Sequence, residues 1–147
     1  MKKSTLILAT FVCLMLSSVA TLAYSRAHSS SHLLAAAKAF VEEHFPGQDI
    51  AYTEVDSEYM STRFEVHLNN GFELTFNEQG TWEKIDCHYA PVPEHLVPAG
   101  INDYVNVNFQ GAFVTKIDKE HYGYEVELSN NVDLWFDMQG NLIDIEV

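Results

Sequence analysis

Two stretches of this chain, offset by 60 residues, decide its fold. Phe64–Ile85 reads FEVHLNNGFELTFNEQGTWEKI, and Tyr124–Ile145 reads YEVELSNNVDLWFDMQGNLIDI. Aligned without a gap, they agree at nine of 22 positions: Glu65/Glu125, Val66/Val126, Leu68/Leu128, Asn70/Asn130, Leu74/Leu134, Phe76/Phe136, Gln79/Gln139, Gly80/Gly140 and Ile85/Ile145. Such agreement in a short window indicates an internal repeat, which determines the architecture before any single element is assigned. The sequence therefore predicts two copies of one unit.

Each copy contains an alternating hairpin. In the first copy the apolar residues Phe64, Val66, Leu68, Phe72, Leu74 and Phe76 share one side, and the other side carries Glu65, His67, Glu73 and Thr75. For Leu68 and Phe72 to share a side, the turn between them must hold three residues, with Gly71 in the left-handed conformation. Asn131 takes the same position in the second copy, and asparagine is the next most tolerant residue there.

A helix is expected before each hairpin. The first has apolar residues at helical spacing, a serine cap and a Pro-Gly stop: Ser30 or Ser31, Leu33, Leu34, Ala37, Val41, Phe45 and Pro46-Gly47. The second runs between Pro98 and Gly111 with the stripe Ile101, Tyr104, Val105 and Phe109. Four strands should follow each helix, near 50–55, 59–68, 72–76 and 81–86, and near 113–118, 122–128, 132–136 and 142–147. Trp82 and Ile85 differ in parity, which predicts a bulge or a change of exposure between them.

The N-terminus is typical of an exported protein. A basic start, Met1-Lys2-Lys3, precedes the apolar run Leu6–Leu16 and two small-residue cleavage sites that end at Ala20 and Ala23. The run is too short for a typical membrane span, and an uncleaved anchor is the alternative. The predicted organisation is a signal peptide (1–23), a short tether (24–31) and one domain (32–147), with repeats at about 32–87 and 98–147 and a connector at 88–97.

Charge and cysteine content restrict the function further. The chain has 8 basic and 21 acidic residues, and loss of Lys2 and Lys3 with the signal peptide changes the net charge from −13 to −15. This acidity argues against nucleic acid and anionic membranes as partners. Only Cys87 remains after cleavage, so no internal disulfide is expected.

These motifs carry a family resemblance. Residues 64–70 and 124–130 (FEVHLNN and YEVELSN), residues 74–80 and 134–140 (LTFNEQG and LWFDMQG), and helices that end His44-Phe45-Pro46-Gly47 and Asn108-Phe109-Gln110-Gly111 resemble the PepSY-like, beta-lactamase-inhibitor-like family of exported proteins typical of Bacteroidetes. The resemblance implies an α+β fold of two tandem repeats, each a helix followed by a four-stranded antiparallel sheet, as in the beta-lactamase inhibitor protein. It also implies a periplasmic location. Its motifs are structural, and it implies no catalytic residues.

No motif for catalysis, metal or cofactor binding stands out. Cys87, His88 and His95 do not have the paired spacing of a zinc site, and neighbours on a strand point to opposite faces. Cys87 is expected to be a half-buried thiol rather than a nucleophile. Asn77–Gly80 and Asp137–Asn141 resemble calcium loops but lack the spacing of oxygen ligands and are sufficient as hairpin turns. We therefore expect no enzyme, no cofactor and no metal.

A binding surface is the better hypothesis. The sheet face away from the helices should carry Trp135 among acids, because Leu134 and Phe136 point into the core. The candidate partner-binding residues are Trp135, Glu65, His67, Glu73, Glu125, Glu127 and Asp133. They predict a non-enzymatic periplasmic binding protein, with an inhibitory or chaperone-like outcome, that engages a protein or peptide of basic character. A cation or small basic ligand held by the same carboxylates is the alternative, an enzyme that uses Cys87 is the third hypothesis, and packing of Trp135 against the connector or the other repeat stays open.

Overall fold

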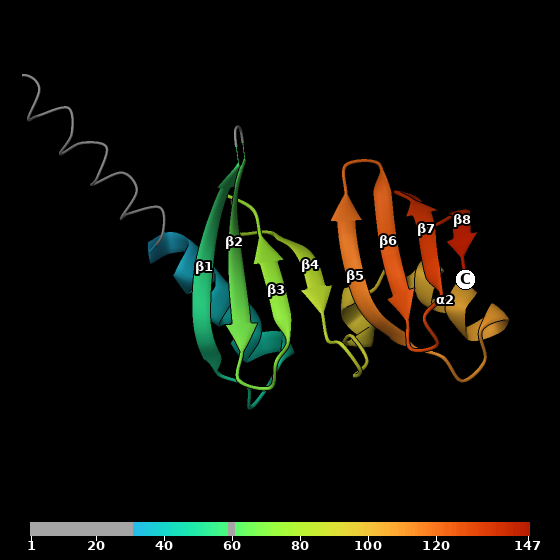
Figure 1. Ribbon diagram of the computed structural model, residues 1–147, viewed down its shortest axis with the longest axis horizontal. Coiled ribbons are helices and arrows are strands. Elements are labelled where there is room, and N and C mark those ends of the chain that lie inside the picture. Colours follow the sequence, from blue (N-terminus) through green and yellow to red (C-terminus); the bar gives the residue numbers. More distant parts are fainter. Residues whose placement is uncertain (1–30, 59–60) are drawn as a thin grey trace, which may run out of the picture.

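The protein folds into one antiparallel sheet with helices on one side. The computed structural model describes residues 31–58 and 61–147 (Figure 1). The predicted signal peptide and most of the tether lie outside these residues. No helix in the described part of the chain is long and apolar enough to cross a membrane.

The sheet has eight strands, and each strand pairs with the next one along the chain. The first repeat supplies β1 (Ile50–Glu58), β2 (Ser61–Leu68), β3 (Glu73–Phe76) and β4 (Trp82–Asp86). The second supplies β5 (Val114–Glu120), β6 (Gly123–Leu128), β7 (Asp133–Asp137) and β8 (Leu142–Glu146). The α+β class and the tandem repeats predicted from the sequence are confirmed.

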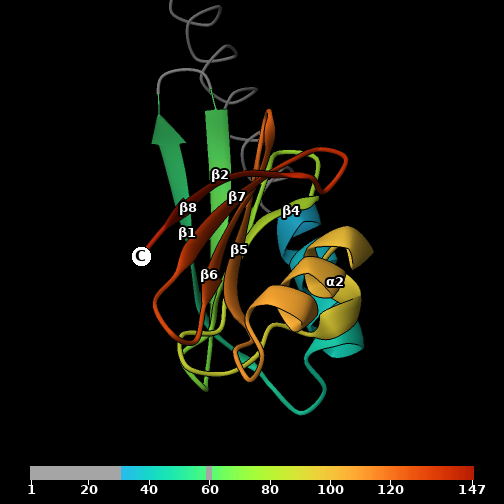
Figure 2. The ribbon, with the colours of Figure 1, turned by 90° about the vertical axis from the view of Figure 1, so that its right-hand side faces the viewer.

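Both repeats place a helix on the same face of the sheet. Among the described residues, 31–44 form the first helix, and α2 (Ala99–Asn108) follows the connector, which contains the short helix η1 (Glu94–Leu96). Figure 2 shows the helices gathered on one side of the strands, with the other side uncovered. Leu33, Ala37 and Val41 are buried because they recur every fourth residue and so form one helical stripe.

The core lies between the helices and the sheet, and the two repeats contribute matching residues to it. The equivalent side chains of the two hairpins are all at most 3% exposed: Val66/Val126, Leu68/Leu128, Leu74/Leu134 and Phe76/Phe136. Gly71 and Asn131 both have positive φ, 90° and 60°, as the three-residue turns require. A register shift between β3 and β4 leaves Glu83 without a partner between Trp82 and Lys84, so the expected bulge is present.

The two four-stranded units form a single sheet through the ladder between β4 and β5. Lys84 pairs with Asp118, Ile85 with Ile117, and Asp86 with Lys116. Ile85 and Ile117 are fully buried, so the core is continuous from one repeat to the other.

Cys87 belongs to this core. Its side chain is only 1% exposed, so the expectation of a half-buried thiol is wrong. Burial, with a smaller contribution from the carboxylate of Asp86, raises the pKa of the Cys87 thiol from 9.0 to about 12. The thiolate is the nucleophilic and metal-binding form, and it is therefore scarce near neutral pH.

Truncation of Leu74 or Leu134 to alanine tests the continuity of the core. Each substitution should lower the free energy of unfolding by about 2–5 kcal/mol, because each removes a fully buried side chain and leaves a cavity. Calorimetry should show a single transition that both variants shift. Two transitions, each moved by one substitution only, would mean that the repeats unfold independently.

Thiol labelling tests the burial of Cys87. At pH 8 a disulfide reagent should modify the folded protein very slowly, because a thiol with a pKa of about 12 is ionised in only about one molecule in ten thousand. The same reagent should react rapidly in denaturant. Fast labelling of the folded protein would contradict the buried position.

Candidate functional site

The uncovered face of the sheet, here called the open face, carries two rows of side chains that cross all eight strands. The strand registers give the first row as Glu54, Glu65, Thr75, Lys84, Asp118, Glu125, Trp135 and Asp144. They give the second row as Tyr52, His67, Glu73, Asp86, Lys116, Glu127, Asp133 and Glu146. All seven residues proposed from the sequence lie in these rows, on the side away from the helices. Their role in binding stays a prediction.

The open face of the second repeat is strongly acidic. From His121 to Val147 the chain has six acidic residues and no lysine or arginine. All six belong to the open side, by alternation with core residues in β6 and β7 and by their place opposite Trp135 and Asp133 in β8: Glu125, Glu127, Asp133, Asp137, Asp144 and Glu146. Glu127, Asp133 and Glu146 are directly opposite one another on three neighbouring strands. Like charges opposite each other destabilise a sheet, so this row costs free energy in the isolated protein.

Trp135 lies within this acidic surface. It is half-buried, and its cross-strand neighbours are Glu125 and Asp144. Its neighbours along the chain, Leu134 and Phe136, are buried in the core, whereas the indole is on the opposite side of the sheet. The connector packs on the core side through Val92 and Val97 and so does not cover it.

The few cations on the open face lie in the first repeat and at its junction with the second. The ammonium group of Lys116 is 3.9 Å from the carboxylate of Glu125, and Arg63 Nε is 3.8 Å from Glu83. A hollow of about 550 Å³ beside the β4–β5 ladder has Arg63, Lys84 and Lys119 in its wall together with several acids. Its mixed charges contrast with the uniformly negative charge of β6, β7 and β8.

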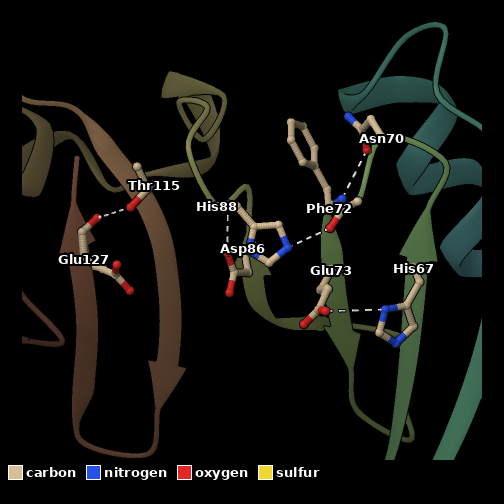
Figure 3. A network of polar contacts seen from close by, with 9 residues as sticks. His67, Asn70, Phe72, Glu73, Asp86, His88, Thr115 and Glu127 are labelled. Carbon is tan, nitrogen blue, oxygen red and sulfur yellow. Dashed lines mark hydrogen bonds and ion pairs between the residues drawn. The ribbon is translucent and has the colours of Figure 1, made fainter. Parts of the chain in front are cut away.

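The first repeat holds a different group of polar side chains. Glu54, Glu65 and His67 each offer a ligand atom within 4.8 Å of the others. His67 Nδ1 is 3.6 Å from a carboxylate oxygen of Glu73 (Figure 3). The Tyr52 ring stacks on the imidazole, with 4.2 Å between ring centroids. His67 Nε2 is buried and has no hydrogen-bond partner among the described residues. A histidine with a carboxylate near one nitrogen and the other nitrogen free is similar to the arrangement common in metal ligands, where the carboxylate is hydrogen-bonded to the ring.

Sequence reasoning missed Tyr52 and Glu54 as members of this group. Tyr52 and Glu54 alternate along the first predicted strand, and that alternation was the signal available. It did not show which neighbouring strand they would face, because register is a property of the folded sheet.

The two turns that resemble calcium loops use their oxygens internally. Asp137 Oδ1 accepts hydrogen bonds from the backbone N–H groups of Gln139 and Asn141, and its Oδ2 accepts one from the Asn141 side chain. These bonds, with that of the Asn141 side chain the largest contribution, lower the pKa of Asp137. Asn77 caps the equivalent turn of the first repeat in the same way.

Cys87, His88 and His95 do not converge on a common point. Cys87 points into the core, while His88 has a positive φ of 52°, and its ring contacts Asp86 and the carbonyl oxygen of Gly71 (Figure 3). His95 is instead bonded to His44, with 2.9 Å between Nε2 and Nδ1. The three therefore do not form a catalytic or metal-binding group.

Comparison with solved structures shows close similarity to periplasmic proteins of Bacteroides. The chain is 38% identical to a protein described as a putative calcium-regulated periplasmic protein from Bacteroides thetaiotaomicron, with a TM-score of 0.73 over 76% of this chain and 88% of that one. A putative periplasmic protein of unknown function from Bacteroides vulgatus is 32% identical, with a TM-score of 0.74 over 77% and 90%. Another from that organism is 36% identical, with a TM-score of 0.72 over 76% and 88%. No curated protein matches the chain.

The family assignment agrees with the repeat. Two overlapping segments, residues 27–78 and 62–144, match the family described as "Putative beta-lactamase-inhibitor-like, PepSY-like". The resemblance predicted from the hairpin motifs is confirmed, and the chain belongs to the PepSY-like, beta-lactamase-inhibitor-like family.

Proposed function

We propose that this protein is a non-enzymatic periplasmic binding protein that engages a basic protein or peptide through the open face of its second repeat. The observation that carries the proposal is the half-buried Trp135 beside the carboxylate row of Glu127, Asp133 and Glu146. Tryptophan is enriched among residues that dominate binding energy, because it offers a large rigid surface. A cationic partner would relieve the repulsion within the row.

The two repeats provide an internal comparison that favours a specific role for the second. The same backbone positions in the first repeat carry Thr75 instead of Trp135, and His67 instead of Glu127. Both versions fit the same strand geometry, so the fold does not require the tryptophan or the uniform negative charge. A surface that exists only for solubility would not need an aromatic residue at its centre.

A periplasmic location is supported by the N-terminal sequence and by the similar structures, which are described as periplasmic proteins. A binding role is favoured over catalysis because the Cys87 thiol is buried and protonated, and because no base in the described part of the chain converges on it. An inhibitory outcome would agree with the family description.

Substitution of Trp135 tests this proposal. Trp135→Ala and Asp133→Asn should each lose partners that the wild type captures from a Bacteroides periplasmic extract, and Trp135→Ala should weaken binding to a purified partner by about 2 kcal/mol. Melting temperature should change little, because the indole is outside the core. Glu73→Gln, at the position in the first repeat that matches Asp133, is the control and should bind normally.

The result against the proposal is equally specific. Retention of the same proteins by Trp135→Ala, or unfolding of that variant, would show that Trp135 is not a partner anchor. Loss of binding in Glu73→Gln as severe as in Asp133→Asn would show that the second repeat has no special role.

A second candidate function is divalent cation binding in the first repeat. The group of Glu54, Glu65 and His67 favours it, and one of the similar proteins is described as calcium-regulated. Calcium prefers oxygen ligands, whereas a histidine nitrogen suits zinc, so the two metals distinguish how the group is used.

Calorimetric titration with calcium and with zinc tests this candidate. If zinc binds here, His67→Ala and Glu65→Gln should both reduce its affinity; if calcium binds, only Glu65→Gln should matter. Glu125→Gln, at the position of the second repeat that matches Glu65, is the control. Unchanged titrations in the first-repeat variants would rule the site out. Salt dependence is a second test: moderate salt should release bound cations more readily than a protein partner held by Trp135.

A further inference from the structure

Strands β4 and β8 occupy equivalent places in the two repeats but have different surroundings. β4 pairs with β3 on one side and β5 on the other, whereas β8 pairs only with β7 within the described chain and forms the edge of the sheet (Figure 1). Ile85 of β4 is fully buried, and its equivalent, Ile145 of β8, is 40% exposed. Ile143, in the bulge of the same strand, is 59% exposed. In the first repeat this edge of the fourth strand, β4, is paired with β5. In the second repeat the corresponding edge, that of β8, is exposed.

The backbone of β8 is oriented to accept such a strand. In the first repeat the Cys87 N–H donates a hydrogen bond to the Thr115 carbonyl oxygen. Hydrogen-bonded pairs recur at every second residue of an antiparallel ladder. Ile85 and Ile117, which are opposite each other, therefore form the next such pair. The matching N–H of Ile145 is not bonded to β7 but donates to its own neighbour, with 2.9 Å between the nitrogen and Asp144 Oδ1. The Asp144 carboxylate thus takes the place that a carbonyl oxygen of a ninth strand would occupy.

The side chains of β8 specify the chemistry of the missing neighbour. Where β4 and β5 meet, Ile85 packs opposite Ile117, and opposite charges pair on both flanks. β8 carries Asp144, Ile145 and Glu146 at the equivalent positions, an acidic–apolar–acidic pattern. An antiparallel strand that complements it must read basic–apolar–basic, because opposite charges across a pair stabilise a sheet.

A second copy of this chain does not fit that pattern. Within the described residues the other edge of the sheet is β1, which has Glu54 and Asp56 on its open face. If β1 of one copy lay beside β8 of another, these carboxylates would be next to Asp144 and Glu146. Two β8 strands in antiparallel register would set Asp144 against Glu146. Like charges opposite each other oppose both arrangements.

We propose that the β8 edge binds an extended basic–apolar–basic segment of the partner by strand addition, in the orientation that β5 takes beside β4. The inference rests on the proposed function, because the same basic partner would contact Trp135, whose cross-strand neighbour is Asp144. Main-chain hydrogen bonds to β8 would supply affinity, and Ile145 with its two acidic flanks would supply selectivity. Release of the Ile145 N–H from Asp144 would free that carboxylate to pair with a lysine.

Peptides based on β5 test the proposal. The basic probe has the sequence of residues 114–120 with lysine in place of Asp118. The acidic probe has glutamate in place of both Lys116 and Asp118. The proline probe is the basic probe with proline in place of Ile117. Fluorescence anisotropy should show that the wild-type protein binds the basic probe about tenfold or more tightly than the acidic one, since two cross-strand pairs change from attraction to repulsion. The proline probe keeps the charge but lacks the N–H that would donate to Ile145, so it should bind as weakly as the acidic probe.

Variants of the protein complete the test. The double variant Asp144→Lys/Glu146→Lys should prefer the acidic probe, and both of its changes are at the exposed edge. Ile145→Pro should no longer bind the basic probe, whereas Ile145→Val should still bind it. Equal binding of the basic and proline probes, or an unchanged preference in the double variant, would overturn strand addition even if Trp135→Ala still abolishes partner capture. If the probes show strand addition to β8 but Trp135→Ala captures its partners normally, only the proposed role of the open face would be rejected.

Discussion

The ladder between β4 and β5 is the constraint on which the rest of the structure depends. A single helix with a four-stranded sheet buries little apolar surface, and small units of this kind are marginal in stability. Pairing of Ile85 with Ile117 places two fully buried side chains at the centre of one shared core, and residues of opposite charge stand opposite each other on both flanks. Because the ladder joins two antiparallel units edge to edge, all eight strands present one uncovered face.

Duplication leaves the two faces of the sheet under different constraints. On the core side the repeats keep identical residues, as at Val66/Val126 and Phe76/Phe136, because close packing tolerates few changes of volume. On the open face packing does not restrict the side chain, and equivalent positions differ, as with Thr75 and Trp135. The differences between repeats therefore show where a function that the fold does not require has been placed.

Electrostatics divides the open face into two halves. Lys84 and Lys116 lie at the junction of the repeats, where they pair with Asp118 and Asp86 across the ladder. The first repeat also holds Arg63 and His67, whereas beyond Glu120 the chain has no lysine or arginine. The negative potential is consequently concentrated over β6, β7 and β8, at the end of the sheet that also has Trp135 and an edge strand with exposed isoleucines. A basic, extended partner satisfies all three features at once.

Local patterns determined much of this protein from the sequence alone. The repeat, the alternating hairpins, the left-handed turn positions of Gly71 and Asn131 and the bulge near Trp82 follow from residue spacing, because side-chain direction in a strand has a period of two. The outward direction of Trp135 follows from the same rule. Only the tertiary structure decided which strands are neighbours: β4 meets β5 while β8 stays at an edge, and Glu54 and Tyr52 face His67. It also decided that Cys87 is fully buried. These features depend on contacts between residues that are distant in the chain. Ile85 and Ile145 are the same residue type in the same local sequence pattern. They differ in burial because β4 has β5 beside it, whereas β8, within the described chain, has a neighbour on one side only.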